Sequence, residues 1–286
     1  MENEFKSALV MEGGAMRGMF TCGVLDVFME NGIKFDACAG VSAGATFSCN
    51  FKSGQAGRAL RYNKKYSKDP KYCSIRSLIK TGDLYGADFC YREIPDCLDI
   101  FDKKAFRENP MPFYVAATDV YTGKPVYHNC TKGDERDVLW MRASASMPVL
   151  ARIVEVDGYR LLDGGISDPV PYKYMEDLGY NRNVIILTQP DNYKKRRSRA
   201  MPVIKLVLNK YPAIISAMNV RHELYEKQLS EIRKREKSGK SIVIRPQKSL
   251  GISRTEKNPE ELERVYREGR KEAERRLSEI REFLHE

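Results

Sequence analysis

Short apolar runs and segments with helical spacing alternate along the first two thirds of the chain. The apolar runs predict buried strands at residues 7–11, 35–39, 113–118 and 183–188. Helical spacing predicts helices at 19–31, 43–60 and 134–145, the second of them interrupted at Ser53-Gly54. Two hairpins are expected, joining 113–118 to 125–128 and 152–156 to 159–162. The alternation of strands and helices predicts a large α/β domain.

The remaining segments suggest a lid and a C-terminal extension. Residues 61–110 are polar and aromatic with several prolines and glycines, and we expect them to form a lid or wall. Beyond 183–188, interpreted as the last core strand, the pattern predicts helices at 202–208, 213–235 and 258–284 and a strand at 241–245. The last helix is amphipathic and is expected to dock on the domain, with a membrane-lying or partner helix as the alternative. We therefore divide the chain into residues 1–190 and a basic, mainly helical extension, residues 191–286.

The stretch Gly40-Val41-Ser42-Ala43-Gly44 lies between a predicted strand and a predicted helix. This is the context of a G-x-S-x-G nucleophile elbow, in which a strained turn presents the serine hydroxyl. Side chains at Gly40 or Gly44 would collide with the neighbouring strand or helix. The following helix directs its positive end at the place where an oxyanion would form. An ordinary turn of small residues is the alternative.

A glycine-rich turn, Gly13-Gly14-Ala15-Met16-Arg17-Gly18, follows the first strand. Free main-chain N–H groups in such a turn suit an anion, which is either a phosphate or the oxyanion of acyl transfer. The dinucleotide-binding fingerprint is matched poorly, because Ala15 occupies its third glycine position and Phe35-Asp36 leads into the elbow. No P-loop sequence is present.

A third element is Asp163-Gly164-Gly165, at the end of the second predicted hairpin. A carboxylate at the end of a strand, followed by two glycines, can stand beside another turn. Asp-Gly is also a common turn dipeptide, so this pattern alone leaves both interpretations open.

Taken in order, Gly13 to Gly18, Gly40 to Ala45, Ala145-Ser146-Met147-Pro148 and Asp163-Gly164-Gly165 resemble the patatin-like phospholipase family of the bacterial type. The resemblance covers about residues 7–190. It implies a three-layer α/β/α sandwich with a mostly parallel central sheet, and a Ser–Asp dyad that acts on lipid esters. Carried over to this chain, it implies Ser42 as nucleophile, Asp163 as general base, and oxyanion-hole N–H groups from Gly13, Gly14 and Ala15. Supporting motif positions are Arg17, Gly18, Gly40, Gly44, Gly164 and Gly165.

Ala15 departs from the family's third glycine. An alanine keeps its N–H group, which remains a donor if φ is negative at this position. Arg17 matches the family's basic position, either as a direct catalytic participant or as part of a surface or structural ion pair.

The histidines independently favour a dyad over a triad. The chain has His128, His222 and His285, and His222 alone follows Asp163 without being penultimate. A triad histidine must reach the serine to accept its proton. His222 lies in a charged helical segment and not in a loop at the end of a strand, which argues against that role. Asp163 would then accept the serine proton itself, helped by a raised pKa in an apolar pocket.

We therefore expect a serine lipid acyl hydrolase that cleaves fatty-acyl esters of (lyso)phospholipids or related lipids. No cofactor and no metal are expected, because no His/Cys/Asp group has ligand spacing. The alternatives are a catalytically idle lipid or acyl-chain binding protein and a Ser-His-Asp carboxylesterase using His222.

Charge is distributed unevenly between the two parts of the chain. Residues 1–180 contain 23 Lys and Arg against 24 Asp and Glu, whereas residues 181–286 contain 26 against 15. The basic C-terminal region suggests an anionic membrane surface as partner, through Lys194, Lys195, Arg196, Arg197 and Arg199. A solvated loop without a partner is the alternative. Nucleic acid is not expected, because no interleaved aromatics or reading motif accompany the charge.

The cysteines and the apolar runs bear on location. Seven cysteines without CxxC pairing predict buried reduced thiols. No apolar run approaches the ~18 residues that span a bilayer, and the N-terminal apolar core is too short for a secretory signal. We expect a cytoplasmic protein, with peripheral association at the inner membrane surface as a further option.

Overall fold

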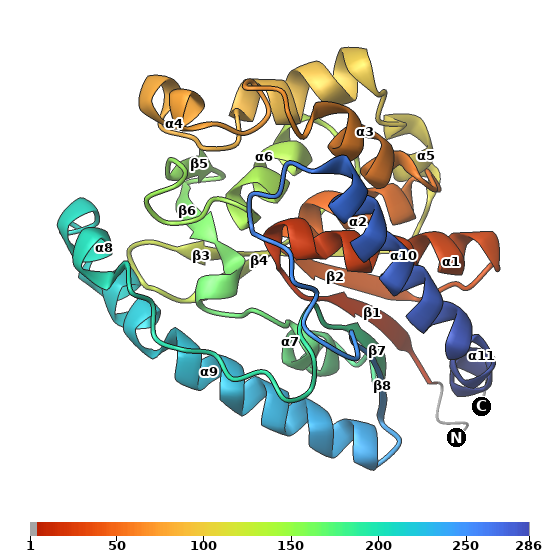
Figure 1. The fold of residues 1–286 in the computed structure, drawn as a ribbon. Coiled ribbons are helices and arrows are strands. Elements are labelled where there is room, and N and C mark those ends of the chain that lie inside the picture. Colours follow the sequence, from red (N-terminus) through yellow and green to blue (C-terminus); the bar gives the residue numbers. More distant parts are fainter. Residues whose placement is uncertain (1–4, 286) are drawn as a thin grey trace.

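The computed structural model describes residues 5–285 and contains an eight-stranded, mostly parallel sheet (Figure 1). The strand order is β5-β6-β3-β2-β1-β7-β8, and β4 pairs with β3. The strands are β1 (Ser7–Met11), β2 (Ala37–Val41), β3 (Phe113–Asp119), β4 (Pro125–Asn129), β5 (Val154–Val156), β6 (Tyr159–Asp163), β7 (Arg182–Ile186) and β8 (Ser241–Ile244). Strands β3, β2, β1, β7 and β8 run parallel, and the β3–β4, β3–β6 and β5–β6 pairs are antiparallel.

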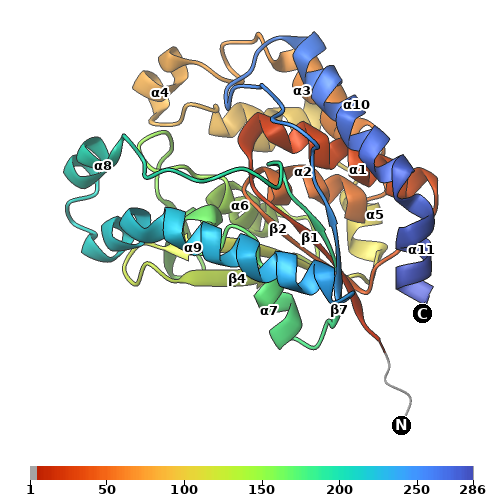
Figure 2. The same ribbon diagram turned by 60° about the horizontal axis from the view of Figure 1, so that its bottom comes forward.

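Helices cover both faces of this sheet (Figures 1 and 2). One layer contains α1 (Gly18–Glu30), α2 (Ala43–Lys52), α3 (Arg58–Tyr66), α5 (Lys103–Glu108), α6 (Glu135–Ser144), α10 (Pro259–Arg275) and α11 (Leu277–His285). The opposite layer contains α7 (Tyr172–Asp177) and the long α9 (Pro212–Lys237). The protein is thus a three-layer α/β/α sandwich with a helical C-terminal region, as the sequence predicts.

The central strands are apolar throughout because both of their faces are buried. In β1, Leu9 and Met11 pack into the core beneath α1 and α2, while Ala8 and Val10 pack toward α7 and α9. A parallel strand covered by helices on both sides needs such a continuous apolar run. This requirement explains why β1 was recognisable from sequence alone.

Most elements form where the sequence predicts them, and the clearest differences lie in the C-terminal part. Strand β7 is not the last strand of the core, because β8 pairs in parallel with it from Asn183↔Ser241 to Ile186↔Ile244. The helix predicted over 258–284 is two helices, with α10 ending at Arg275 and α11 starting at Leu277. The division at residue 190 stays a prediction, and the region beyond it completes the central sheet and packs on α1.

Residues 61–110 form several short helices beside the sheet. They include the end of α3, α4 (Ile75–Thr81), the wide-turn helix η2 (Phe89–Leu98) and α5. Pro95 lies inside η2, where its missing N–H removes one helical hydrogen bond. None of the helices within residues 5–285 has both the length and the apolar character needed to cross a bilayer.

Candidate active site

Ser42 lies on a strained turn between β2 and α2. Its φ is +55° and its ψ is −122°, a conformation that is rare for a residue with a side chain. The Ser42 N–H donates to Ser144 Oγ at 2.8 Å, and Ser144 Oγ donates to the Ala116 carbonyl at 2.6 Å. These two hydrogen bonds tie the turn to α6 and β3, and so hold the strained backbone in place.

The glycines on either side of Ser42 allow the close packing that the sequence predicts. A Cβ at Gly44 would lie 2.5 Å from the Met11 carbonyl oxygen of β1. A Cβ at Gly40 would overlap the Gly44 carbonyl group of α2. The elbow therefore fits between strand and helix only without side chains at these two positions.

The side chain of Asp163, at the end of β6, lies beside that of Ser42, which follows β2. The Ser42 Oγ donates to Asp163 Oδ2 at 2.7 Å, although 121 positions separate the two residues. Asp163 Oδ1 accepts from the Gly165 N–H at 2.8 Å, and the Asp163 N–H donates to the Ser146 carbonyl at 2.8 Å. The Ala145 to Pro148 segment thus helps to hold the carboxyl group in place.

Burial acts strongly on this carboxyl group, which is 5% exposed. Burial raises the pKa of Asp163 above its ordinary value, and the Arg221 charge and the hydrogen bonds from Ser42 and Gly165 oppose that rise. A carboxylate with a raised pKa is a better proton acceptor than an exposed one. Ser42 and Asp163 together can therefore activate a hydroxyl nucleophile.

The glycine-rich loop approaches Ser42 closely. A Cβ at Gly13 would lie 2.8 Å from the Ser42 Cβ, so this position admits only glycine. Within residues 5–285, no main-chain carbonyl accepts a hydrogen bond from the N–H groups of Gly13, Gly14 or Ala15. These donors are therefore available to a ligand anion.

Ala15 does not have the negative φ on which its N–H group was expected to depend as a donor. Its φ is +50°, in the left-handed region that glycine adopts without steric cost. This positive φ explains why the family pattern has a glycine at this position. Alanine keeps the N–H group but holds it in a strained conformation.

The remaining motif residues have packing roles. A Cβ at Gly18 would lie 2.9 Å from the Ala43 Cβ, and one at Gly164 would overlap the Ala116 carbonyl of β3.

Arg17 makes none of the ion pairs formed within residues 5–285, and its Nε is buried without a hydrogen-bond partner there. The surface ion pair considered for Arg17 is therefore absent from this part of the chain.

The histidines make contacts of their own. His128 Nε2 lies 2.8 Å from Asp137 Oδ1, and His222 Nε2 lies 3.7 Å from Glu223 within α9. The Ser42 hydroxyl hydrogen bond goes to Asp163. This geometry favours the dyad over a triad that uses His222.

One side-chain group has its potential metal-ligand atoms close together, which the sequence spacing did not indicate. It consists of His128, Cys130 and Asp137. Asp137 Oδ2 accepts the N–H groups of Lys132 and Gly133, and Oδ1 pairs with His128. Burial raises the pKa of the Cys130 thiol, which disfavours the thiolate that metals bind. The group already has internal partners and serves to fix the loop before α6.

An apolar pocket of about 130 Å³ opens beside Ser42. The aromatic side chains of its wall come mainly from the 61–110 segment, which supplies Tyr62, Tyr72, Tyr85, Tyr91 and Phe101 together with Ile94. The wall predicted for this segment is therefore present. Sequence reasoning did not assign these aromatic residues individually, because their spacing follows no single helix or strand.

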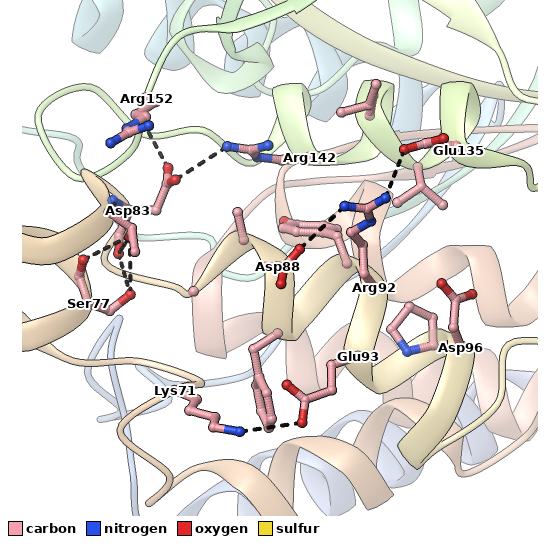
Figure 3. A pocket seen from close by; sticks show the side chains of 18 of the residues that line it. Lys71, Ser77, Asp83, Asp88, Arg92, Glu93, Asp96, Glu135, Arg142 and Arg152 are labelled. Atoms are coloured by element: carbon pink, nitrogen blue, oxygen red, sulfur yellow. Dashed lines mark hydrogen bonds and ion pairs between the residues drawn. The ribbon is translucent and has the colours of Figure 1, made fainter.

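A larger and more polar groove of about 930 Å³ adjoins this pocket and shares Tyr91, Pro95 and Val138 with it. Several of its charged side chains pair with one another (Figure 3). Arg142 lies 3.3 Å from Asp83, and Arg92 lies 3.5 Å from Glu135. Local carboxylates thus offset the charge of these two arginines.

Comparison with known proteins gives two family matches. A family model described as "Patatin-like phospholipase" matches residues 9–175. A second, described as "Domain of unknown function (DUF6363)", matches residues 211–285. In fold, the chain is similar to VipD from Legionella pneumophila, with a TM-score of 0.47 and 13% identity over 97% of this chain and 67% of that one.

Curated relatives align with the N-terminal part of the chain. The uncharacterized protein YjjU of Escherichia coli K12 is 34% identical over 187 residues, which cover 64% of this chain and 52% of that protein. The uncharacterized NTE family protein Rv1063c of Mycobacterium tuberculosis H37Rv is 29% identical over 165 residues, covering 57% and 44%. Lysophospholipase nte1 of Aspergillus terreus is 24% identical over 184 residues, covering 60% and 11%. The chain spans about half the length of the first two relatives. By the match over residues 9–175, it belongs to the patatin-like phospholipase family.

Proposed function

We propose that this protein is a serine acyl-ester hydrolase that cleaves fatty-acyl esters of (lyso)phospholipids or related lipids. The observation that carries the proposal is the 2.7 Å hydrogen bond from Ser42 Oγ to a buried Asp163 carboxylate, on a strained turn. A hydroxyl is a poor nucleophile until a base within hydrogen-bond reach accepts its proton. Family membership adds support, and one relative is named a lysophospholipase.

In the first half-reaction, Ser42 Oγ attacks the ester carbonyl carbon while its proton passes to Asp163. The carbonyl oxygen becomes an oxyanion, and the free N–H groups of Gly13, Gly14 and Ala15 donate hydrogen bonds to it. When the tetrahedral intermediate collapses, the bond to the alcohol oxygen breaks. Asp163 returns the proton to that alcohol, which leaves an acyl group on Ser42.

In the second half-reaction, water attacks the acyl carbonyl carbon and gives one proton to Asp163. The bond from the acyl carbon to Ser42 Oγ then breaks, and Asp163 returns the proton to Ser42. The carboxylic acid leaves, and the enzyme regains its starting protonation state. Since Asp163 acts as base and acid in each half-reaction, a pKa above its ordinary value suits both steps.

The acyl group of the proposed substrate is assigned to the pocket beside Ser42. The pocket wall is mainly aromatic and aliphatic, and burying an acyl chain contributes about 0.8 kcal/mol per CH₂. A short, polar ester would bury little apolar surface against such a wall and would gain little binding free energy from it. Fatty-acyl esters therefore fit the site better than short polar ones.

An anionic membrane surface is proposed as the place where the protein meets its substrate. Lys194, Arg196 and Arg199 are exposed in the loop after β7. Helix α8 (Met201–Val207), directly after this loop, exposes Leu206 by 75% and Val207 by 55%. Cations beside exposed aliphatic side chains suit a lipid interface.

Replacing Ser42 tests the hydrolase proposal against an idle lipid binder. Ser42→Ala is expected to abolish p-nitrophenyl ester turnover and labelling by a fluorophosphonate probe. Ser230→Ala, an exposed serine on α9, is the matched control and should keep both. Activity or labelling that survives in Ser42→Ala would remove Ser42 from the mechanism, and an unlabelled wild-type protein would favour the idle binder. Loss of activity in His222→Ala would favour the triad carboxylesterase instead.

A further inference from the structure

Four basic side chains lie near enough to one another for their charges to interact, and two of them, Arg221 and Lys195, also act on Asp163. Arg17 lies in the glycine-rich turn, Lys195 lies in the loop after β7, Arg221 lies on α9, and Arg254, which is exposed, precedes α10. None of the four belongs to the ion pairs formed within residues 5–285, although most arginines of α10 are paired there. Three of the four come from the region beyond residue 190.

Arg221 reaches the catalytic carboxyl group most closely. Its Nε donates to the Gly165 carbonyl, which fixes the guanidinium. A Cβ built at Gly165 would lie 3.0 Å from Asp163 Oδ1 and 3.2 Å from Arg221 Nη2. The guanidinium and the carboxyl group thus flank the same glycine. Burial lowers the pKa of Arg221, and the Asp163 charge raises it.

Lys195 points inward and not toward solvent. Its Nζ lies 4.3 Å from the centroid of the Tyr225 ring, and Tyr225 Oη donates to Glu12 Oε1 at 2.6 Å. Burial and the neighbouring charges of Arg221, Arg254 and Arg17 lower the pKa of Lys195 to about 7, although the Glu12 charge raises it. The like charge around its ammonium group is therefore offset only in part.

Two nearby carboxylates, Glu12 and Asp163, offset part of this charge but do not balance the four cations. Glu12 Oε2 accepts from the Thr188 N–H at 2.6 Å and from Thr188 Oγ1 at 3.0 Å, and Oε1 accepts from Tyr225. Asp163 is engaged by Ser42 and Gly165. In the groove of Figure 3, by comparison, Arg142 and Arg92 each have a carboxylate partner.

Like charges held together in a partly buried site raise the free energy of the folded protein unless an anion joins them. The Nε of Arg17 is buried without a hydrogen-bond partner in the described part of the chain, so it still has a donor to offer. Guanidinium and ammonium groups are the preferred partners of phosphate oxygens. None of the four cations lines the apolar pocket.

We propose that Arg17, Lys195, Arg221 and Arg254 form a subsite for the phosphate group of an anionic lysophospholipid, on the side of the leaving alcohol. The inference deepens the proposed hydrolase function and rests on it. The acyl chain lies in the apolar pocket, the ester carbonyl lies at Ser42, and the glycerol phosphate lies among the cations. The region matched by the domain of unknown function thereby gains a role, because it supplies Arg221 and Arg254.

Turnover of two matched substrates tests the subsite. The substrates are 1-hexanoyl lysophosphatidic acid and 1-hexanoylglycerol, which share the acyl ester and differ in the phosphate. Wild-type protein is expected to show a kcat/KM about tenfold or more higher for the phosphorylated substrate. Lys195→Met and Arg254→Met should each lower that ratio severalfold, and Lys195→Arg should restore it. Lys240→Met, an exposed lysine preceding β8, is the matched control and should keep the ratio. A wild-type ratio near one, or ratios unchanged in both variants, overturns the subsite.

Binding to the Ser42→Ala variant separates this inference from the hydrolase proposal. Calorimetry with the same two ligands is expected to give tighter binding of the phosphorylated one, weakened by Lys195→Met. That result supports the subsite even if no ester is hydrolysed. Hydrolysis without preference for phosphate in either experiment refutes the subsite and leaves the hydrolase standing. Binding of inorganic phosphate alone, with no difference between the two acyl ligands, also refutes it.

Discussion

At the scale of single residues, Asp163 combines two opposing effects. Burial destabilises its carboxylate form, while Ser42, the Gly165 N–H and Arg221 stabilise that form, and the net result is a raised pKa. A proton acceptor in this position is useful because it can also return the proton. The cost is borne by the folded protein, since the buried charge is less favourable than a solvated one.

Asp163→Asn is therefore expected to lower activity and to increase stability at neutral pH. Turnover of a p-nitrophenyl ester should fall by about 100-fold or more, since general base catalysis contributes roughly that much. The folded-state pKa of Asp163 lies above its unfolded value, so its ionisation penalises folding at pH above that pKa. The penalty disappears as the pH falls and wild-type Asp163 becomes protonated. Thermal unfolding should thus show a higher Tm for Asp163→Asn at pH 7 and a smaller difference at pH 4.5. A lower Tm for the variant at pH 7 would contradict this account.

The residues at this site differ in how far the sequence predicted them. Ser42 and Asp163 follow from short local patterns, a strand, a turn and a glycine, and the structure brings these two side chains together. Lys195 was expected in a solvent-facing basic loop, and it instead lies over the ring of Tyr225. Nothing in the local sequence distinguishes it from Lys194 or Arg196. Its direction is set by a helix 30 positions away, which no local pattern reports.

At the scale of elements, the contact between α1 and α10 joins the two ends of the chain. A Cβ at Gly23 would overlap the Tyr266 carbonyl, and one at Gly269 would overlap the Phe20 carbonyl. The two helices therefore approach through glycine on both sides. Tyr266 Oη donates to Asp26 Oδ2 at 2.7 Å, and the Gly57 N–H also donates to this oxygen. Helix α10 thus packs in the same helical layer as α2, which follows the elbow.

Gly269→Ala separates helix propensity from packing. In an exposed helix position this change would stabilise the helix by about 1 kcal/mol. Here the added methyl group meets the Phe20 carbonyl, and overpacking typically costs about 1–3 kcal/mol. We expect a lower free energy of unfolding in urea for Gly269→Ala, while Glu268→Ala, an exposed neighbour, changes it little. Equal or greater stability of Gly269→Ala would show that α10 can move away from α1 without loss.

The break between α10 and α11 could not be predicted from the sequence, because tertiary contacts determine it. The amphipathic pattern over 258–284 continues through Arg276, and no glycine or proline lies between residues 270 and 284, so the pattern predicts one helix. Arg276 Nη1 instead donates to the Val243 carbonyl of β8, and its other nitrogens pair with Glu279 at 2.6 to 2.8 Å. These contacts hold the chain at the junction of α10 and α11. The parallel strands, in contrast, were predictable because burial on both faces requires apolar runs.

At the scale of the whole molecule, two helices expose aliphatic side chains on one side. Ile75 and Ile79 of α4 are 71% and 81% exposed, and Leu206 of α8 is 75% exposed. Both views of the fold place α4 and α8 on the side toward which β1 runs from the N-terminus (Figures 1 and 2). Arg76 and Lys80 accompany the first helix, and Lys205 accompanies the second. Exposed apolar residues with basic neighbours suit an anionic lipid surface.

Leu206→Gln is expected to weaken binding to vesicles that contain phosphatidylglycerol. Transfer of a leucine side chain out of water contributes about 1.5–3 kcal/mol, and 1.4 kcal/mol corresponds to tenfold in affinity. Sedimentation with vesicles should therefore show about tenfold weaker binding for Leu206→Gln. Leu178→Gln is the matched control, because Leu178 is 44% exposed next to α7, away from α8 (Figure 2). Because each lysine or arginine near a charged bilayer adds about 1 kcal/mol, binding should also fall with salt for the wild type and both variants. Equal binding of the two variants would contradict docking through α8, and absence of wild-type binding at low salt would contradict the membrane proposal itself.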